Sequence, residues 1–143
     1  MAHFYFSYGM NTNPEAMKLR TGNAVPLGSA LLKNYKLRFA VYADVVPDTT
    51  SEVYGVLWRI DDDALVALDI REGYPEFYNR KTVKVRCNNE SYDAIVYFMT
   101  PGARSELPTN GYLNTIIDGY TAFKVPTNQV YQALNVFERF RQE

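Results

Sequence analysis

The segment from Tyr78 to Met99 constrains the fold of this chain more than any other. Its first part, Tyr78 to Arg86, alternates Tyr, Arg, Thr and Lys on one side with Lys and Val on the other, and Tyr92 to Met99 forms a second apolar run. Asn88-Asn89 lies between them, and asparagine tolerates the left-handed backbone that a tight hairpin turn requires. The segment therefore predicts an antiparallel pair of strands.

The N-terminal segment predicts a strand, a tight turn and a helix. Residues 3 to 8 alternate between two sets that both contain aromatic residues, a pattern typical of a strand buried on both faces, and Gly9 ends this run. Asn13 is a candidate N-cap, followed by Pro14 at the first helical position and by Glu15. A helix is therefore expected to begin here.

Further strands are expected in the middle of the chain. Two runs, Gly28 to Lys33 and Tyr35 to Tyr42, have β-strand character. The polar stretch Asp44 to Ser51, which contains Pro47, is predicted to separate them from another strand at Val53 to Ile60.

Helices are predicted after this region. Asp61-Asp62-Asp63 caps a helix that ends at Gly73, and the stretch Thr100 to Asn110 shows no periodicity. Two more helices follow, with the apolar stripes Leu113, Ile116, Ile117, Tyr120 and Val130, Leu134, Phe137. With about six strands and about four helices not in βαβ alternation, we expect one α+β domain over residues 1–143, with a small, mixed, mostly antiparallel, barrel-like sheet and flanking helices.

Composition excludes several function classes. The chain has 143 residues, 47% of them hydrophobic, and 15 Lys and Arg balance 16 Asp and Glu without any block of like charge. A nucleic-acid partner or an anionic membrane partner is therefore disfavoured. Because Cys87 is the single cysteine and His3 the single histidine, we expect no intrachain disulfide and no metal site. Carboxylates, tyrosines and backbone amides would have to carry any catalysis.

The sequence also bears on location. The first residues lack the pattern of a signal peptide, and no run approaches about 18 apolar residues. A cytoplasmic protein without a membrane partner is expected.

The first candidate site is the loop Tyr8-Gly9-Met10-Asn11. A turn between a strand and a helix directs successive N–H groups toward one point, which suits a carboxylate or an oxyanion. Gly9 permits close approach to the backbone, and Asn11 adds a side-chain donor. In the alternative interpretation, Gly9 only turns the chain and Asn11 only forms a local cap.

The second candidate is Glu72, at the expected end of a helix. The negative end of the helix dipole disfavours an ionised carboxylate, which raises its pKa and suits a general base. The alternative is a solvated glutamate paired with Arg71 or Arg80.

Tyrosines give the third signal, because the chain has 12 of them. Tyr78 and Tyr112 each border an irregular segment, and a tyrosine offers a flat apolar face with one hydroxyl, which suits a small-molecule pocket. The alternative is ordinary packing at a sheet edge.

Four segments in order resemble the γ-glutamylcyclotransferase family, including its γ-glutamylamine cyclotransferase and AIG2-like branches. Phe4 to Asn11 resembles the opening strand and the Tyr-Gly-Ser-Asn loop, and Tyr54 to Trp58 resembles the strand written Gly-Val-hydrophobic-Trp. Leu68 to Gly73 resembles Leu-Asp-x-x-Glu-Gly, with Tyr78 opening the next strand. Tyr97-Phe98-Met99 resembles the last strand of the family, and the stretch Pro108 to Tyr112 resembles the loop that follows it.

The resemblance implies a cofactor-independent enzyme that converts a γ-glutamyl amine or amino acid to 5-oxoproline and a free amine. It assigns the general base and acid to Glu72, the glutamyl-binding loop to residues 8–11, and the pocket lining to Tyr78 and Tyr112. Met10 departs from the serine that the family usually has, and the loop Thr100 to Asn110 is the expected selector of the leaving amine. Two alternatives stay open: a catalytically silent protein that binds a small ligand, and a scaffold that docks a protein partner. The sequence leaves the oligomeric state and the leaving amine open.

Overall fold

The computed structural model describes residues 2–141, with side chains through residue 138. Residues 1, 142 and 143 of the predicted domain therefore lie outside the described part. The elements, in chain order, are β1 (His3–Ser7), the 3₁₀ turn η1 (Met10–Thr12), α1 (Pro14–Thr21), β2 (Val25–Ala40), β3 (Tyr42–Ile60), α2 (Asp62–Glu72), β4 (Tyr78–Cys87), β5 (Glu90–Met99), α3 (Asn110–Phe123) and α4 (Asn128–Arg141).

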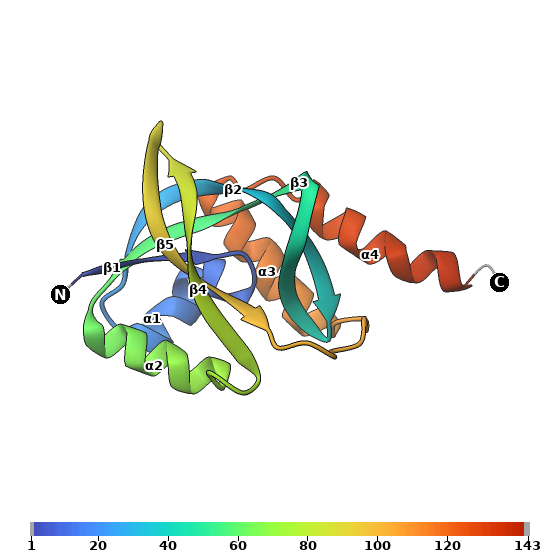
Figure 1. Ribbon diagram of the computed structural model, residues 1–143, viewed down its shortest axis with the longest axis horizontal. Coiled ribbons are helices and arrows are strands. Elements are labelled where there is room, and N and C mark those ends of the chain that lie inside the picture. The colour runs from blue at the N-terminus through green and yellow to red at the C-terminus, as the bar shows by residue number, and fades with distance from the viewer. Residues whose placement is uncertain (1, 142–143) are drawn as a thin grey trace.

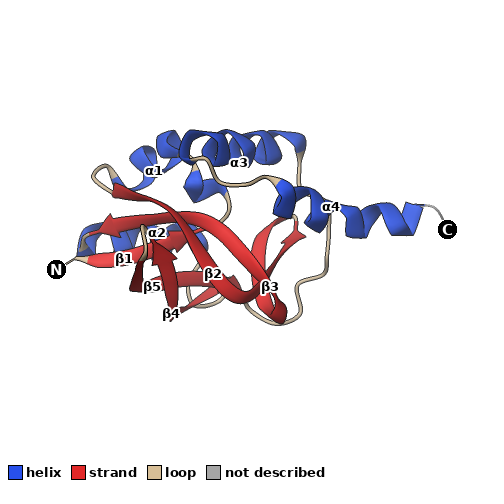
Figure 2. Ribbon diagram, turned by 90° about the horizontal axis from the view of Figure 1, so that it is seen from above, coloured by secondary structure: helices blue, strands red, loops and turns tan. Residues whose placement is uncertain are grey.

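The strands of the described chain form a closed barrel in the order β1-β3-β2-β4-β5 (Figure 1). Neighbouring strands are antiparallel except β1 and β5, which run parallel and meet at Tyr5 and Ile95. Figure 2 shows α1, α3 and α4 along one side of the sheet. The α+β fold with a mixed, mostly antiparallel barrel is thus confirmed.

The predicted division of the sheet into six strands is wrong, because two of the expected boundaries do not exist and an unexpected one, at Val41, separates β2 from β3. The run at 28–33 joins residues 35–40 of the next run in β2, with Asn34 between them at a φ of 70°. The chain then turns at Val41, and Tyr42 begins β3. The polar stretch Asp44 to Ser51 lies inside β3, where the pairing shifts from Lys33–Glu52 to Tyr35–Pro47. Polar residues 48–51 bulge out of the ladder while the backbone stays extended, so the strand continues and does not end.

Local signals place the helix ends and the tight turn correctly. The side chain of Asn13 accepts hydrogen bonds from the backbone N–H groups of Glu15 and Ala16. Asp61 caps α2 through Ala64, and Gly73 ends that helix in the left-handed conformation. Asn88 and Asn89 turn β4 into β5, both at positive φ. These contacts fix where the loop after β1 and the end of α2 lie.

The long hairpin of β2 and β3 supplies much of the barrel wall, and the core is filled by large buried side chains such as Phe6, Leu57 and Tyr120. Among residues 2–141, no helix is long and apolar enough to cross a membrane.

Candidate functional site

A cavity of about 340 Å³ opens at one end of the barrel. It is lined by all seven residues that the sequence singles out: Tyr8, Gly9, Met10, Asn11, Glu72, Tyr78 and Tyr112. The cavity therefore brings together the loop after β1, the end of α2, the start of β4 and the first turn of α3.

Close backbone packing holds the loop of residues 8–11 in the cavity wall. A Cβ on Gly119 of α3 would lie 2.7 Å from the Asn13 nitrogen, so only glycine lets α3 approach η1 this closely. The buried Tyr120 donates its hydroxyl proton to the Tyr8 carbonyl oxygen at 2.6 Å. The first N–H groups of a helical turn have no acceptor inside the turn, and Gly9, Met10 and Asn11, at the start of η1, line the cavity.

Glu72 ends α2 and turns its carboxylate into the cavity. Its Oε1 accepts a hydrogen bond from Asn11 Nδ2 at 3.1 Å. Burial raises the pKa of Glu72, and the charges of Arg20 and Arg71 and the Asn11 hydrogen bond oppose that rise. Burial, the leading cause, differs from the helix dipole expected from the sequence, although the direction is the same.

In the alternative interpretation, a solvated Glu72 pairs with Arg71 or Arg80, but among the described residues no ion pair joins Glu72 to either arginine. Arg80 forms an ion pair with Asp69 at 3.1 Å. Glu72 is largely enclosed, and Asn11 is the hydrogen-bond donor that contacts it. A buried carboxylate with a raised pKa, in contact with a donor, has the properties of a general base.

Tyr78 and Tyr112 both bond to the backbone of Ala43, which is buried in β3. The Tyr78 hydroxyl donates to the Ala43 carbonyl at 2.6 Å, and the Tyr112 hydroxyl accepts from the Ala43 N–H at 2.9 Å. The backbone of Ala43 thus fixes the hydrogen-bonding role of each hydroxyl. Tyr112 can still donate its own proton toward the cavity, whereas Tyr78 can only accept a hydrogen bond.

Burial raises the pKa of Tyr112 to about 12 and that of Tyr8 and Tyr78 well above the usual value. The three hydroxyls are therefore neutral in the physiological range and act as hydrogen-bonding groups, not as bases.

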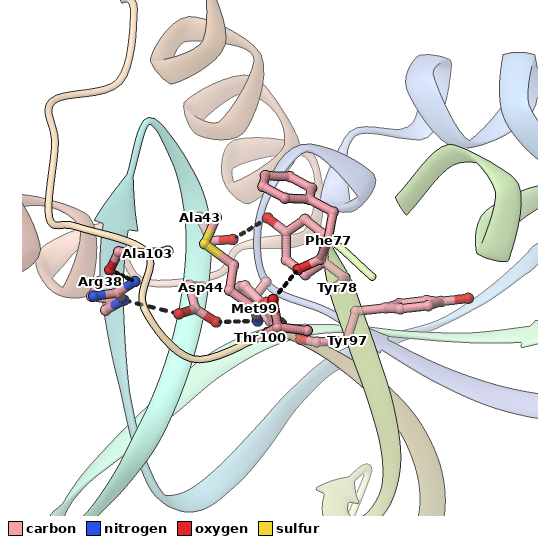
Figure 3. A network of polar contacts seen from close by, with 10 residues as sticks. Arg38, Ala43, Asp44, Phe77, Tyr78, Tyr97, Met99, Thr100 and Ala103 are labelled. Atoms are coloured by element: carbon pink, nitrogen blue, oxygen red, sulfur yellow. Dashed lines mark hydrogen bonds and ion pairs between the residues drawn. The ribbon is translucent and has the colours of Figure 1, made fainter. Parts of the chain in front are cut away.

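A second polar network supports the Ala43 side of the cavity (Figure 3). Asp44 is buried and pairs with Arg38 at 2.9 Å while accepting from the Met99 N–H at 2.8 Å. Arg38 in turn donates to the Ala103 carbonyl at 2.8 Å. This network ties β3, the end of β5 and the start of the 100–109 loop together beside Tyr78.

The family model described as "Gamma-glutamyl cyclotransferase, AIG2-like" matches residues 5–115, which is more than half of the chain. The chain belongs to this family. The match includes all seven predicted site residues, whereas α4 lies beyond it.

Relatives agree with this assignment. The gamma-glutamylcyclotransferase of Mus musculus is 32% identical over 81 residues, which cover 48% of this chain and 43% of the mouse protein. The chain spans about half the length of the curated relatives it matches. A solved structure of a gamma-glutamyl cyclotransferase superposes with a TM-score of 0.84 at 25% identity, covering 93% of this chain and 86% of the other. A Homo sapiens protein described as uncharacterized gives a TM-score of 0.84 at 26% identity, covering 92% and 86%.

One position in this γ-glutamylcyclotransferase-family chain departs from the usual pattern. Met10 is the residue at which the loop differs from the Tyr-Gly-Ser-Asn pattern that it resembles, and its Sδ lies 2.9 Å from Arg20 Nη2. The sulfur thus contacts a guanidinium group from α1.

Sequence reasoning missed several residues that line the cavity. Tyr5 and Tyr97 lie in its wall, and Arg20 reaches it from the last turn of α1. The buried residues Phe6 and Ala43 also line it, and the other three lining residues, Tyr42, Arg71 and Phe77, are exposed. An arginine near a helix C-terminus and an exposed aromatic residue are common on any surface, so no local pattern marks them.

Within the described part of the chain, no group of three or more His, Cys, Asp and Glu side chains is arranged to hold a metal ion.

Proposed function

We propose that this protein is a γ-glutamylcyclotransferase that releases 5-oxoproline and a free amine from a γ-glutamyl amine or a γ-glutamyl amino acid. The observation that carries the proposal is the half-buried Glu72 carboxylate, which accepts a hydrogen bond from Asn11 in the cavity that the loop of residues 8–11 also lines. Membership of the family supports the same reaction class.

The reaction needs one proton shuttle. The α-amino nitrogen of the substrate attacks its own γ-carbonyl carbon, the new C–N bond closes a five-membered ring, and the old amide C–N bond breaks. Glu72 takes a proton from the attacking nitrogen and returns it to the leaving nitrogen, so no proton is gained or lost overall. Because the nucleophile belongs to the same molecule, a cavity that holds the glutamyl chain folded supplies much of the rate increase.

The loop of residues 8–11 has a separate role in this proposal. The N-terminal amides of η1 bind the substrate α-carboxylate or the developing oxyanion, the kind of group that helix N-termini bind. Tyr112, with a hydroxyl proton to donate, and Tyr78, with acceptor capacity, orient the substrate. The reaction as written uses no metal and no cofactor.

A panel of γ-glutamyl compounds tests the proposal. The purified protein is incubated with γ-glutamyl amino acids, γ-glutamyl-ε-lysine and glutathione, and 5-oxoproline is measured. We expect release from at least one compound and a loss of about 10²–10⁴ in kcat for Glu72→Gln. Binding without 5-oxoproline would replace the proposal with a silent binding protein, and neither binding nor release would leave only the fold.

A further inference from the structure

We infer that Arg20 is a positioning residue for Glu72: it fixes the Asn11 carboxamide in the orientation that turns the amide N–H toward the carboxylate. The inference deepens the proposed function, and its kinetic part rests on that function. Among the described residues, no ion pair joins Arg20 to the Glu72 carboxylate, so Arg20 acts through Asn11.

The Asn11 carboxamide uses its polar atoms on three different partners. Asn11 is only 4% exposed, and its Nδ2 donates to the Tyr5 hydroxyl at 2.9 Å and to Glu72 Oε1 at 3.1 Å. Its Oδ1 accepts a hydrogen bond from Arg20 Nη1. The carboxamide therefore links α1, β1 and the end of α2 through one buried side chain.

The chemistry of these partners permits one orientation of the amide. A guanidinium group has donors and no acceptor, so only the Oδ1 side of Asn11 can face Arg20. If the amide were flipped, two N–H donors would meet the guanidinium, and Oδ1 would face the Glu72 carboxylate, where neither oxygen has a proton to donate when Glu72 is ionised. Arg20 thus selects the orientation in which Asn11 is a donor to the base.

A contact with Met10 holds the Arg20 side chain beside Asn11. Its Nη2 lies 2.9 Å from Met10 Sδ, and the side chain is half-buried between α1 and the cavity. In the part of the chain that the structure describes, no ion pair joins Arg20 to an Asp or Glu. Burial lowers the pKa of Arg20 but leaves it a cation at neutral pH, because the starting value is so high.

Several ionisable groups face Glu72 from the surrounding elements. The cations are Arg20 from α1 and Arg71 from α2 itself. The other groups are the hydroxyls of Tyr5, Tyr8, Tyr78 and Tyr112, whose pKa values are all raised. Since the phenols stay neutral, Arg20 and Arg71 are the charges that oppose the effect of burial on Glu72.

The test replaces Arg20 with methionine, which has similar length but neither charge nor donor. Lys18→Met is the matched control, because Lys18 is an exposed cation on the same helix and outside the cavity. Arg20→Lys is the conservative variant, because it restores a cation with N–H donors. Thermal melts verify that each variant is folded.

The first measurement does not depend on activity. The side-chain NH₂ signals of Asn11 in ¹H–¹⁵N NMR spectra are followed as pH is varied. In the wild type and in Lys18→Met we expect these signals to shift as Glu72 titrates. In Arg20→Met we expect that response to be lost, and in Arg20→Lys to return. Signals that still follow Glu72 in Arg20→Met would overturn the inference.

The second measurement is kinetic and uses whichever γ-glutamyl compound the panel identifies. We expect Arg20→Met to lower kcat by about tenfold to a hundredfold with a smaller change in KM, because a misplaced base affects the chemical step more than binding. The acid limb of the pH profile should move to higher pH. Wild-type kcat in Arg20→Met would also overturn the inference. If the wild type releases no 5-oxoproline, the proposed function fails by itself, and the NMR result still decides the role of Arg20.

Discussion

Gly119 of α3 packs directly on Thr12 of η1, and no side chain larger than hydrogen has room between them. A Cβ built at Gly119 would run into the Thr12 hydroxyl and would lie 2.7 Å from the backbone nitrogen of Asn13. The contact joins a helix near the end of the chain to the loop that forms the floor of the cavity.

Gly119→Ala should therefore destabilise the protein by about 1–3 kcal/mol, the usual cost of overpacking, and should displace the loop of residues 8–11. Gly111→Ala is the control, because Gly111 lies in the same helix with nothing within 4 Å of its added Cβ. That change should be neutral or stabilising by up to about 1 kcal/mol. Denaturant unfolding of both variants measures the difference, and equal stabilities would contradict the packing argument.

Wild type and Glu72→Gln should differ in the pH dependence of their stability. Burial raises the pKa of Glu72 in the folded protein, so the fold favours the protonated carboxyl. Glu72 therefore contributes its full stability below the unfolded-state pKa and loses it as pH rises through the folded-state pKa. Glutamine never ionises and loses nothing.

We expect the free energy of unfolding of Glu72→Gln to rise relative to that of the wild type as pH increases from the unfolded-state pKa of Glu72 through its raised folded-state pKa. Denaturant titrations at several pH values measure this. Glu15→Gln removes the same charge from an exposed position and serves as the comparison. A Glu72→Gln variant that loses stability at neutral pH would instead indicate that Glu72 holds a structural ion pair.

Met10→Ser should keep kcat/KM within about tenfold of the wild type, if η1 uses its backbone amides to bind substrate. The exchange removes the contact of Met10 Sδ with Arg20 and supplies the hydroxyl of the Tyr-Gly-Ser-Asn pattern that the loop resembles. Steady-state kinetics on the panel substrate give the answer. An increase of more than tenfold would assign the serine hydroxyl a direct role in other family members.

Tyr112→Phe should destabilise the protein more than Tyr78→Phe. Loss of the Tyr112 hydroxyl leaves the buried Ala43 N–H without its acceptor, which costs about 1–3 kcal/mol, whereas loss of the Tyr78 hydroxyl removes one donor from a carbonyl, at about 0.5–1.5 kcal/mol. Unfolding free energies of the two variants test this order. The reverse order would mean that another group bonds to the Ala43 N–H when Tyr112 is shortened.

Local chemistry explains which parts of the fold the sequence predicts. Asn13, Asp61 and Gly73 mark helix ends because caps act within a few residues, and Asn88-Asn89 marks the hairpin because positive φ is a local demand. The prediction that the polar stretch at 44–51 separates two strands is wrong. Whether this stretch continues a strand depends on its pairing with β2, which composition does not show.

In the candidate site, too, residues with a local sequence pattern were predictable and residues placed by tertiary packing were not. Glu72 and the loop of residues 8–11 have recognisable local patterns, and the cavity lining contains them all. Arg20 has no such pattern, since nothing in the sequence near α1 indicates that its guanidinium reaches Asn11. Only the packing of α1 against α2 and η1 creates that contact, so sequence alone does not predict the orientation of the amide. The roles assigned to these residues stay predictions.

The placement of β1 has a consequence for the order of folding. The β4–β5 hairpin and the β2–β3 hairpin close through neighbouring segments of the chain, whereas β1 pairs with residues Val56 to Ile60 across a separation of about fifty residues. Closing a longer loop costs more chain entropy, so we expect both hairpins to form before β1 inserts between β3 and β5. The loop of residues 8–11 follows β1 directly, so the cavity is completed in the last step. A ligand of the cavity therefore binds only the closed barrel. A substrate mimic that binds there should lower the unfolding rate, because it opposes the separation of β1 from β3 and β5.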